Sequence, residues 1–153
     1  MSGNIGTAFI RINPFGCEIQ GYDLSTEITE DQINELKDLL AQHKLLLFRN
    51  NAEISENRQV EIGRYFGDIE TAGFVPHSKS SNDFILRVSN EADEGLRNFG
   101  TSGFHIDCSF LPNPSCVSLY HMIQASKDGD TGITQDPPPI HSTHLHTYLT
   151  DNN

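Results

Sequence analysis

TEDQINELKDLLAQHKLLLFR, residues 29–49, combines a helix signal with a strand signal. Thr29 and Gln32 have the spacing of a capping box, in which the two residues satisfy backbone donors at the start of a helix. The apolar residues then recur at the spacing of one helix face until about His43 (Ile33, Leu36, Leu39 and Leu40). Leu45 to Phe48 is a continuous apolar run that predicts a buried strand. The stretch therefore predicts a helix that leads directly into a core strand.

Further elements are expected on both sides of this stretch. Upstream, two short strands are predicted around Ile10 and Ile19, with a turn from Asn13 to Gly16. Downstream, Ser55 is placed to cap a second helix that Gly67 ends. Two further apolar runs predict strands (Phe84–Val88 and Val117–Ile123). These elements indicate an α+β fold, and a chain of 153 residues suggests one domain.

Two polar, glycine-containing stretches, residues 71–83 and 89–104, are expected to be loops. Loops of this length in a compact domain often carry function.

Charge and composition exclude several classes of partner. The net charge is −11 and the pI about 4.8, so the chain lacks the basic surface that binds nucleic acid or an anionic membrane. No apolar run approaches the roughly 18 residues of a membrane-spanning helix, and no secretion signal is evident at the start. The three cysteines (Cys17, Cys108 and Cys116) suggest neither a disulfide framework nor a zinc site. A cytoplasmic location is therefore expected.

The composition changes after Thr131. Residues 132–153 contain no Lys or Arg, a Pro137–Pro139 run and three closely spaced histidines (His141, His144 and His146). Because no helix or strand period is visible there, we expect a folded part at 1–131 followed by a flexible Pro/His/Thr-rich tail.

His105 and Asp107 are the candidate metal ligands. In an extended segment, side chains two residues apart point to the same side, so an imidazole and a carboxylate can reach one ion. One such pair, joined by a second His, makes the facial triad of non-haem Fe(II) oxygenases. The spacing alone also fits a surface His beside a capping Asp, and it does not separate these two interpretations.

The order of motifs from Ile10 to Thr131 resembles the TauD/TfdA family of Fe(II)- and 2-oxoglutarate-dependent dioxygenases. The resemblance covers about four fifths of the chain. Its motifs are Gly16–Ile19 with Gly21–Leu24, Glu30–His43 leading into Leu45–Arg49, Arg64–Glu70, Phe104–Phe110 with Pro112 and Pro114, and Gly129–Thr131.

The resemblance implies a fold, a pair of cofactors and a reaction. The implied fold is the N-terminal part of a double-stranded β-helix, or cupin-like jelly-roll, with flanking helices. His105 and Asp107 would hold Fe(II), and Thr131 would help to bind the 2-oxoglutarate carboxylate. The implied enzyme is an oxidoreductase that uses dioxygen to hydroxylate a small organic substrate, with release of succinate and CO2.

The resemblance also bears on the substrate. The positions that contact the sulphonate in taurine-oxidising members are Ala72, Val75 and Thr101 here, and none has the matching residue, so taurine is not expected. Substrate contacts are expected in loops 71–82 and 98–103, with Asn98 and Thr101 as the polar candidates. His77 is another loop candidate, although a solvated loop His is the simpler explanation.

The chain departs from the family after Thr131. Family members continue with a second metal-binding His and an Arg that pairs with 2-oxoglutarate, and neither has a match here. The expected fold is therefore incomplete, and a truncated chain of doubtful activity, prone to self-association, is one prediction. Two alternatives stay open: a non-catalytic fragment that associates with a full-length relative, and a protein whose tail histidines bind metal.

Overall fold

The computed structural model describes residues 7–51, 54–71, 74–89, 91, 93–97, 107, 110–124 and 145–150, the last of these as backbone only. The chain forms two compact units. The first contains residues 1–53 and 116–153, and the second contains residues 54–115. The predicted boundary after Thr131 lies outside the described residues and stays a prediction.

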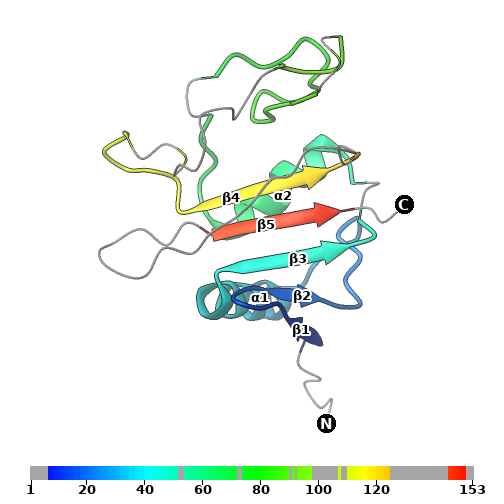
Figure 1. The fold of residues 1–153 in the computed structure, drawn as a ribbon, viewed down its shortest axis with the longest axis vertical. Coiled ribbons are helices and arrows are strands. Elements are labelled where there is room, and N and C mark those ends of the chain that lie inside the picture. Colours follow the sequence, from blue (N-terminus) through cyan, green and yellow to red (C-terminus); the bar gives the residue numbers. More distant parts are fainter. Residues whose placement is uncertain are drawn as a thin grey trace. The chain divides into compact units, whose positions relative to one another are not determined.

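The first unit is built on one sheet of five strands in the order β1-β2-β3-β5-β4 (Figure 1). β1 (Phe9–Arg11) pairs antiparallel with β2 (Cys17–Ile19), and all other neighbours are parallel. β3 (Leu45–Arg49) and β4 (Val117–Met122) agree with two of the predicted strands. A mixed sheet with helices is an α+β arrangement, as the sequence predicts.

Helix α1 (Glu30–His43) forms as its capping box predicts. The Thr29 hydroxyl accepts a hydrogen bond from the Gln32 N–H at 3.3 Å, and the Gln32 side chain accepts one from the Thr29 N–H at 2.9 Å. The helix packs against β3, where Leu46 and Phe48 are buried. The buried face of α1 carries Leu36, Leu39 and Leu40. Residues 29–49 therefore form the centre of this unit's core.

A tight turn brings β1 and β2 together. The Ile12 N–H donates to the Gly16 carbonyl at 2.9 Å, and Gly16 has a φ of 102°. A Cβ atom on Gly16 would lie 2.8 Å from Cδ2 of Leu45. Gly16 is therefore required by both the backbone conformation and the close approach of β3.

Asn51 fixes the end of β3. Its buried side chain accepts a hydrogen bond from the Leu24 N–H at 2.7 Å and donates to the carbonyls of Arg49 and Tyr22 at 2.8 and 3.3 Å. One amide thus satisfies three backbone groups and joins the 22–24 turn to the strand.

The second unit contains helix α2 (Glu56–Phe66), which begins after the Ser55 cap and ends at Gly67 as predicted. Val60 and Ile62 are buried, and the methyl end of Ile69 packs closely over Gly63. The predicted strand at Phe84–Val88 is wrong, because this run forms no ladder and only Val88 makes an isolated bridge, to Leu96. An apolar run supplies the side chains of a strand but not the neighbouring strand that it must pair with.

β5 (Leu145–Thr150) corrects a second expectation. The sequence shows no strand period after Thr131, yet β5 lies in the sheet between β3 and β4 (Figure 1). Its pairing with β3 joins Leu45 to His146, residues that are far apart in the chain. The other residues of 132–153 lie outside those described, so a flexible tail stays a prediction for them.

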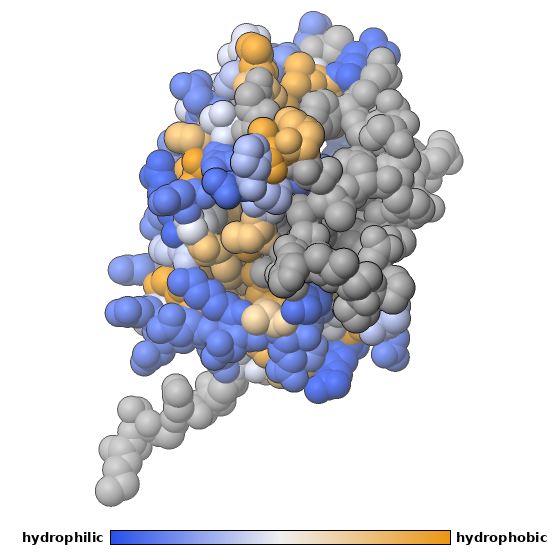
Figure 2. Space-filling view, turned by 90° about the vertical axis from the view of Figure 1, so that its left-hand side faces the viewer, coloured by the Kyte–Doolittle hydropathy of each residue, from blue (hydrophilic) through white to orange (hydrophobic). Residues whose placement is uncertain are grey.

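The described surface carries both polar and apolar side chains. Figure 2 shows polar and charged side chains over much of one face, with apolar ones between them. The most exposed large apolar side chains, Val75 and Phe110, are each 80% exposed. Neither helix in the described part of the chain has the length and apolar character needed to cross a membrane.

Candidate functional site

Asp107 is the one predicted metal or cosubstrate ligand that the described residues include. It lies in a turn of the second unit, and its side chain is half-buried. His105, Thr131, Asn98 and Thr101 lie outside the described residues. The structure therefore neither brings these five residues together nor separates them.

The ligand types of His105 and Asp107 suit iron. His105 and Asp107 supply one imidazole nitrogen and one carboxylate oxygen, which are the ligand types that Fe(II) oxygenases use. Within the described ranges, no group of three or more His, Cys, Asp and Glu side chains is arranged to hold a metal ion. The two residues thus fit two of the three protein ligands of such a site.

The histidines considered as further ligands or site residues have different surroundings. His77 is half-buried, and its Nδ1 accepts a hydrogen bond from the Lys79 N–H at 3.2 Å. This contact shapes the loop around residue 77. His146 lies on β5, while His141 and His144 lie outside the described residues.

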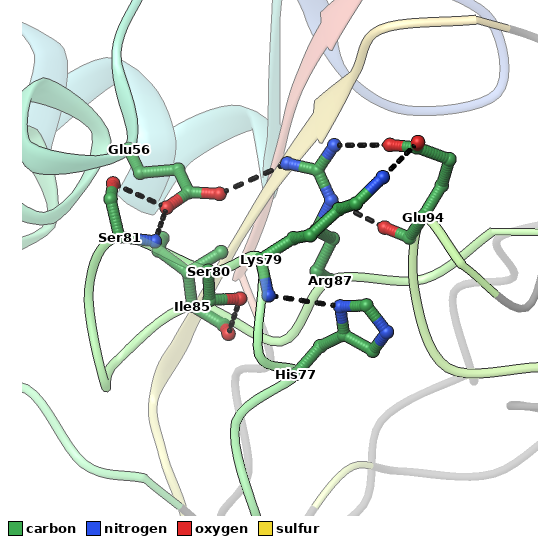
Figure 3. Close-up of polar contacts among 8 residues, drawn as sticks. All are labelled: Glu56, His77, Lys79, Ser80, Ser81, Ile85, Arg87 and Glu94. Carbon is green, nitrogen blue, oxygen red and sulfur yellow. Dashed lines mark hydrogen bonds and ion pairs between the residues drawn. The ribbon is translucent and has the colours of Figure 1, made fainter.

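The best-defined polar cluster of the second unit surrounds Arg87, and Figure 3 shows it between Glu56 and Glu94. We call the set Glu56, Lys79, Ser81, Arg87 and Glu94 the Arg87 clamp. The guanidinium donates from Nη1 to Glu56 Oε1 and from Nη2 to Glu94 Oε2, each at 3.2 Å. Its Nε also donates to the Glu94 backbone carbonyl. One side chain therefore joins the start of α2 to residue 94.

Loop 71–82 is held by the same clamp. Lys79 pairs with the Glu94 carboxylate, and Ser81 donates to Glu56 from its N–H and, at 2.6 Å, from its hydroxyl. Beside the clamp, Asn82 donates to the Asn57 side chain at 2.9 Å. The C-terminal half of this loop is thus fixed to the first turn of α2.

The electrostatics keep both clamp carboxylates ionised. Burial raises the pKa of Glu56, but the hydrogen bonds from Ser81 and the ion pair with Arg87 outweigh it, so the net pKa lies below the ordinary value. The hydrogen bond from Lys79 is the main cause that lowers the pKa of Glu94. Two carboxylates and two cations therefore balance one another near neutral pH.

The comparisons with known proteins agree with the order of motifs. Residues 9–135, more than four fifths of the chain, match the family described as taurine catabolism dioxygenase TauD, TfdA family. This match contains β1 to β4, both helices, His105, Asp107 and Thr131. The chain belongs to this family of dioxygenases.

Three curated proteins with different names are similar to this chain. Pentalenolactone F synthase of Streptomyces avermitilis is 27% identical over 119 residues, which cover 74% of this chain and 39% of the relative. An alpha-ketoglutarate-dependent dioxygenase of Penicillium expansum is 26% identical over 138 residues, which cover 84% of this chain and 38% of the relative. An alkylsulfatase of Acinetobacter baylyi is 28% identical over 117 residues, which cover 76% of this chain and 35% of the relative. The chain spans less than two fifths of the length of each of these relatives.

The Arg87 clamp was not predicted from the sequence. The residues that contact each other in it are 7 to 31 positions apart in the chain, and no short motif signals such contacts. The sequence offers one signal, a pair of cationic residues near a loop that is expected to be functional. Lys79 lies within loop 71–83, and Arg87 follows shortly after it.

Proposed function

We propose that this chain is part of an Fe(II)- and 2-oxoglutarate-dependent dioxygenase that hydroxylates a small organic substrate. The observation that carries the proposal is the family match over residues 9–135, which contains an imidazole and a carboxylate two residues apart. The cupin-like jelly-roll of the family, release of succinate and CO2, and a cytoplasmic location belong to the same proposal.

Each predicted residue has a defined role in this proposal. His105 and Asp107 hold Fe(II), and the Thr131 hydroxyl donates a hydrogen bond to a 2-oxoglutarate carboxylate. When bound, iron and 2-oxoglutarate supply the oxidising power, while the protein orients the substrate. Asn98 and Thr101 are the proposed polar contacts to that substrate.

An anaerobic Fe(II) titration with and without 2-oxoglutarate tests the proposal. A visible charge-transfer band is expected only when both are present, because it requires 2-oxoglutarate to chelate the iron. His105→Ala and Asp107→Ala are expected to abolish the band. Asp38→Ala, which removes an exposed carboxylate from α1, is the matched control and is expected to leave the band unchanged.

A titration without a band would reject the proposal for this chain acting alone. The ligand count favours a second candidate in that case, since the chain matches two of the family's three protein ligands. This candidate is a non-catalytic chain that associates with a longer member of the family. It predicts a complex in size-exclusion chromatography that persists in the His105→Ala variant.

A further inference from the structure

β1 lies in a short segment that is fastened at both ends, and we call residues 7–12 the β1 strap. At one end, the Thr7 N–H and hydroxyl both donate to the Glu35 carboxylate of α1, and the hydroxyl also lies 2.9 Å from the Tyr22 hydroxyl. At the other end, the Ile12 N–H closes the turn that leads to β2. The three residues of β1 between these ends are all exposed, so little burial holds the middle of the strap.

His43 is the contact between α1 and the middle of the strap. The centroid of its ring lies 5.1 Å from that of the Phe9 ring. His43 is 8% exposed and Phe9 is 38% exposed, so the Phe9 ring helps to shield the imidazole from water. In the described sheet β1 is an edge strand that pairs with β2 alone (Figure 1). It can therefore move away without separating any other pair of strands.

The surroundings of His43 are unsuited to a charged imidazole. Its Nε2 is buried and has no hydrogen-bond partner among the described residues, and a buried charge without a partner is costly. Arg11 of β1 adds a positive charge on the same side. Burial lowers the pKa of His43, and the Arg11 cation lowers it further. The imidazole is therefore neutral near pH 7 while the strap is closed.

The other charged groups described around α1 are engaged elsewhere or exposed. Glu18 of β2 binds Arg49 of β3 at 2.9 Å, and Glu35 binds Thr7. The carbonyls at the end of α1 favour a cation, but Lys44 already supplies one, since its Nζ donates to a carbonyl of the last turn at 2.6 Å. The remaining charged residues of α1 are all exposed (Glu30, Asp31, Lys37 and Asp38).

We propose that His43 is a pH-sensitive latch whose protonation releases the β1 strap. Moving Phe9 and Arg11 away lets water reach the imidazolium and removes a neighbouring cation, so protonation favours the open strap. The pKa of His43 is lowered only while the strap is closed. The stability that the neutral imidazole gives the closed strap is therefore fully present above the ordinary pKa of 6.5 and is lost as the pH falls through the lowered pKa. Opening leaves an edge of β2 to which another strand can add.

Amide hydrogen exchange on the full chain, followed by mass spectrometry at a series of pH values, tests the latch. After correction for intrinsic rates, exchange in peptides from residues 8–20 is expected to rise at least about threefold from pH 7.5 to pH 5.5, while peptides from β3 keep their protection. This interval spans the ordinary histidine pKa and lies above that of carboxylates. The Gln20 N–H reports on opening directly, because it donates to the Ala8 carbonyl at 2.9 Å.

Three variants and a control assign the rise to His43. His43→Phe keeps an aromatic ring against Phe9 and cannot be protonated, so the rise is expected to disappear. His43→Gln, which also has no charge to gain, takes its place if His43→Phe does not fold. Arg11→Gln removes the neighbouring cation and is expected to reduce the rise without abolishing it. His77→Gln, in the second unit, is the matched control and is expected to keep the full rise.

Three exchange results would overturn the latch. They are peptides 8–20 already at the unprotected rate at pH 7.5, no change between pH 7.5 and pH 5.5, and a rise in His43→Phe or His43→Gln as large as in the unaltered chain. Nuclear magnetic resonance of the His43 ring protons adds a test that needs no variant. A titration midpoint below 6.5 is expected, and one at or above 6.5 would reject the latch. None of these measurements uses iron, so they stand apart from the dioxygenase proposal.

Discussion

Replacing Asn51 by alanine is expected to destabilise the first unit strongly. The substitution removes the acceptor of the Leu24 N–H and the donors to the Arg49 and Tyr22 carbonyls. A buried polar group left unsatisfied costs about 1–3 kcal/mol, and the Leu24 N–H lies in the buried part of this site. The two carbonyls are partly buried and lose less, so the expected total is about 2–4 kcal/mol of the free energy of unfolding.

Asn51→Asp distinguishes lost hydrogen bonds from lost packing. The carboxylate still accepts from the Leu24 N–H, but its second oxygen replaces the donor that faces the carbonyls of Tyr22 and Arg49. We therefore expect Asn51→Asp to be at least as destabilising as Asn51→Ala near neutral pH, and to recover in part at low pH, where a protonated carboxyl donates again.

Urea unfolding followed by far-ultraviolet circular dichroism measures both variants. Asn57→Ala is the control, because Asn57 is exposed on α2 and its side chain bonds only the Asn82 side chain among the contacts described above. It is expected to change the free energy of unfolding by no more than about 0.5 kcal/mol. The reasoning is refuted if Asn51→Ala costs less than about 0.5 kcal/mol, or no more than Asn57→Ala does.

Three further predictions concern a glycine, a pH dependence and a thiol. Gly16→Ala is expected to lower the melting temperature more than Gly21→Ala, because both have a positive φ but only Gly16 faces Leu45; equal losses would exclude the clash as a cause. The stability that the Arg87 clamp contributes is expected to be present above the ordinary Glu pKa and to be lost as the pH falls through the lowered pKa of Glu56. Amide hydrogen exchange in peptides from residues 74–97, corrected for the intrinsic exchange rate at each pH, should therefore rise only when the pH falls below the ordinary Glu pKa. Burial raises the pKa of the Cys17 thiol to about 11, so iodoacetamide at pH 8 should alkylate the exposed Cys116 well before Cys17; peptide mapping that finds equal labelling would contradict this.

The elements that the sequence predicts well are those with local signals. Both helices carry their own caps, at Thr29 and Ser55, and the capping hydrogen bonds form between residues three positions apart. The turn between β1 and β2 has a glycine at the position that requires a positive φ. These features depend on short-range contacts, which a sequence pattern contains.

The elements that the sequence does not predict depend on distant partners. β5 follows a stretch rich in proline and histidine and becomes a strand by pairing with β3 and β4. Phe84–Val88 has strand-forming residues, but within the described residues it pairs with no strand. The Arg87 clamp joins five residues that are dispersed along the chain, and no sequence periodicity indicates such contacts. For the metal site, His105 and Asp107 follow from a motif, and their geometry stays a prediction.

The place of β5 in the sheet has a consequence for how the chain folds during its synthesis. Because β5 lies between β3 and β4 and pairs with both, the described sheet connects β4 to the other strands only through residues 145–150. The ribosome completes β3 before those residues are made, so one edge of β3 has no β5 to pair with while residues 50–144 are synthesised. Such non-local parallel pairing slows folding, and an open edge in the meantime favours aggregation. Chaperone supply and translation rate are therefore expected to govern the yield of this protein more than its equilibrium stability does.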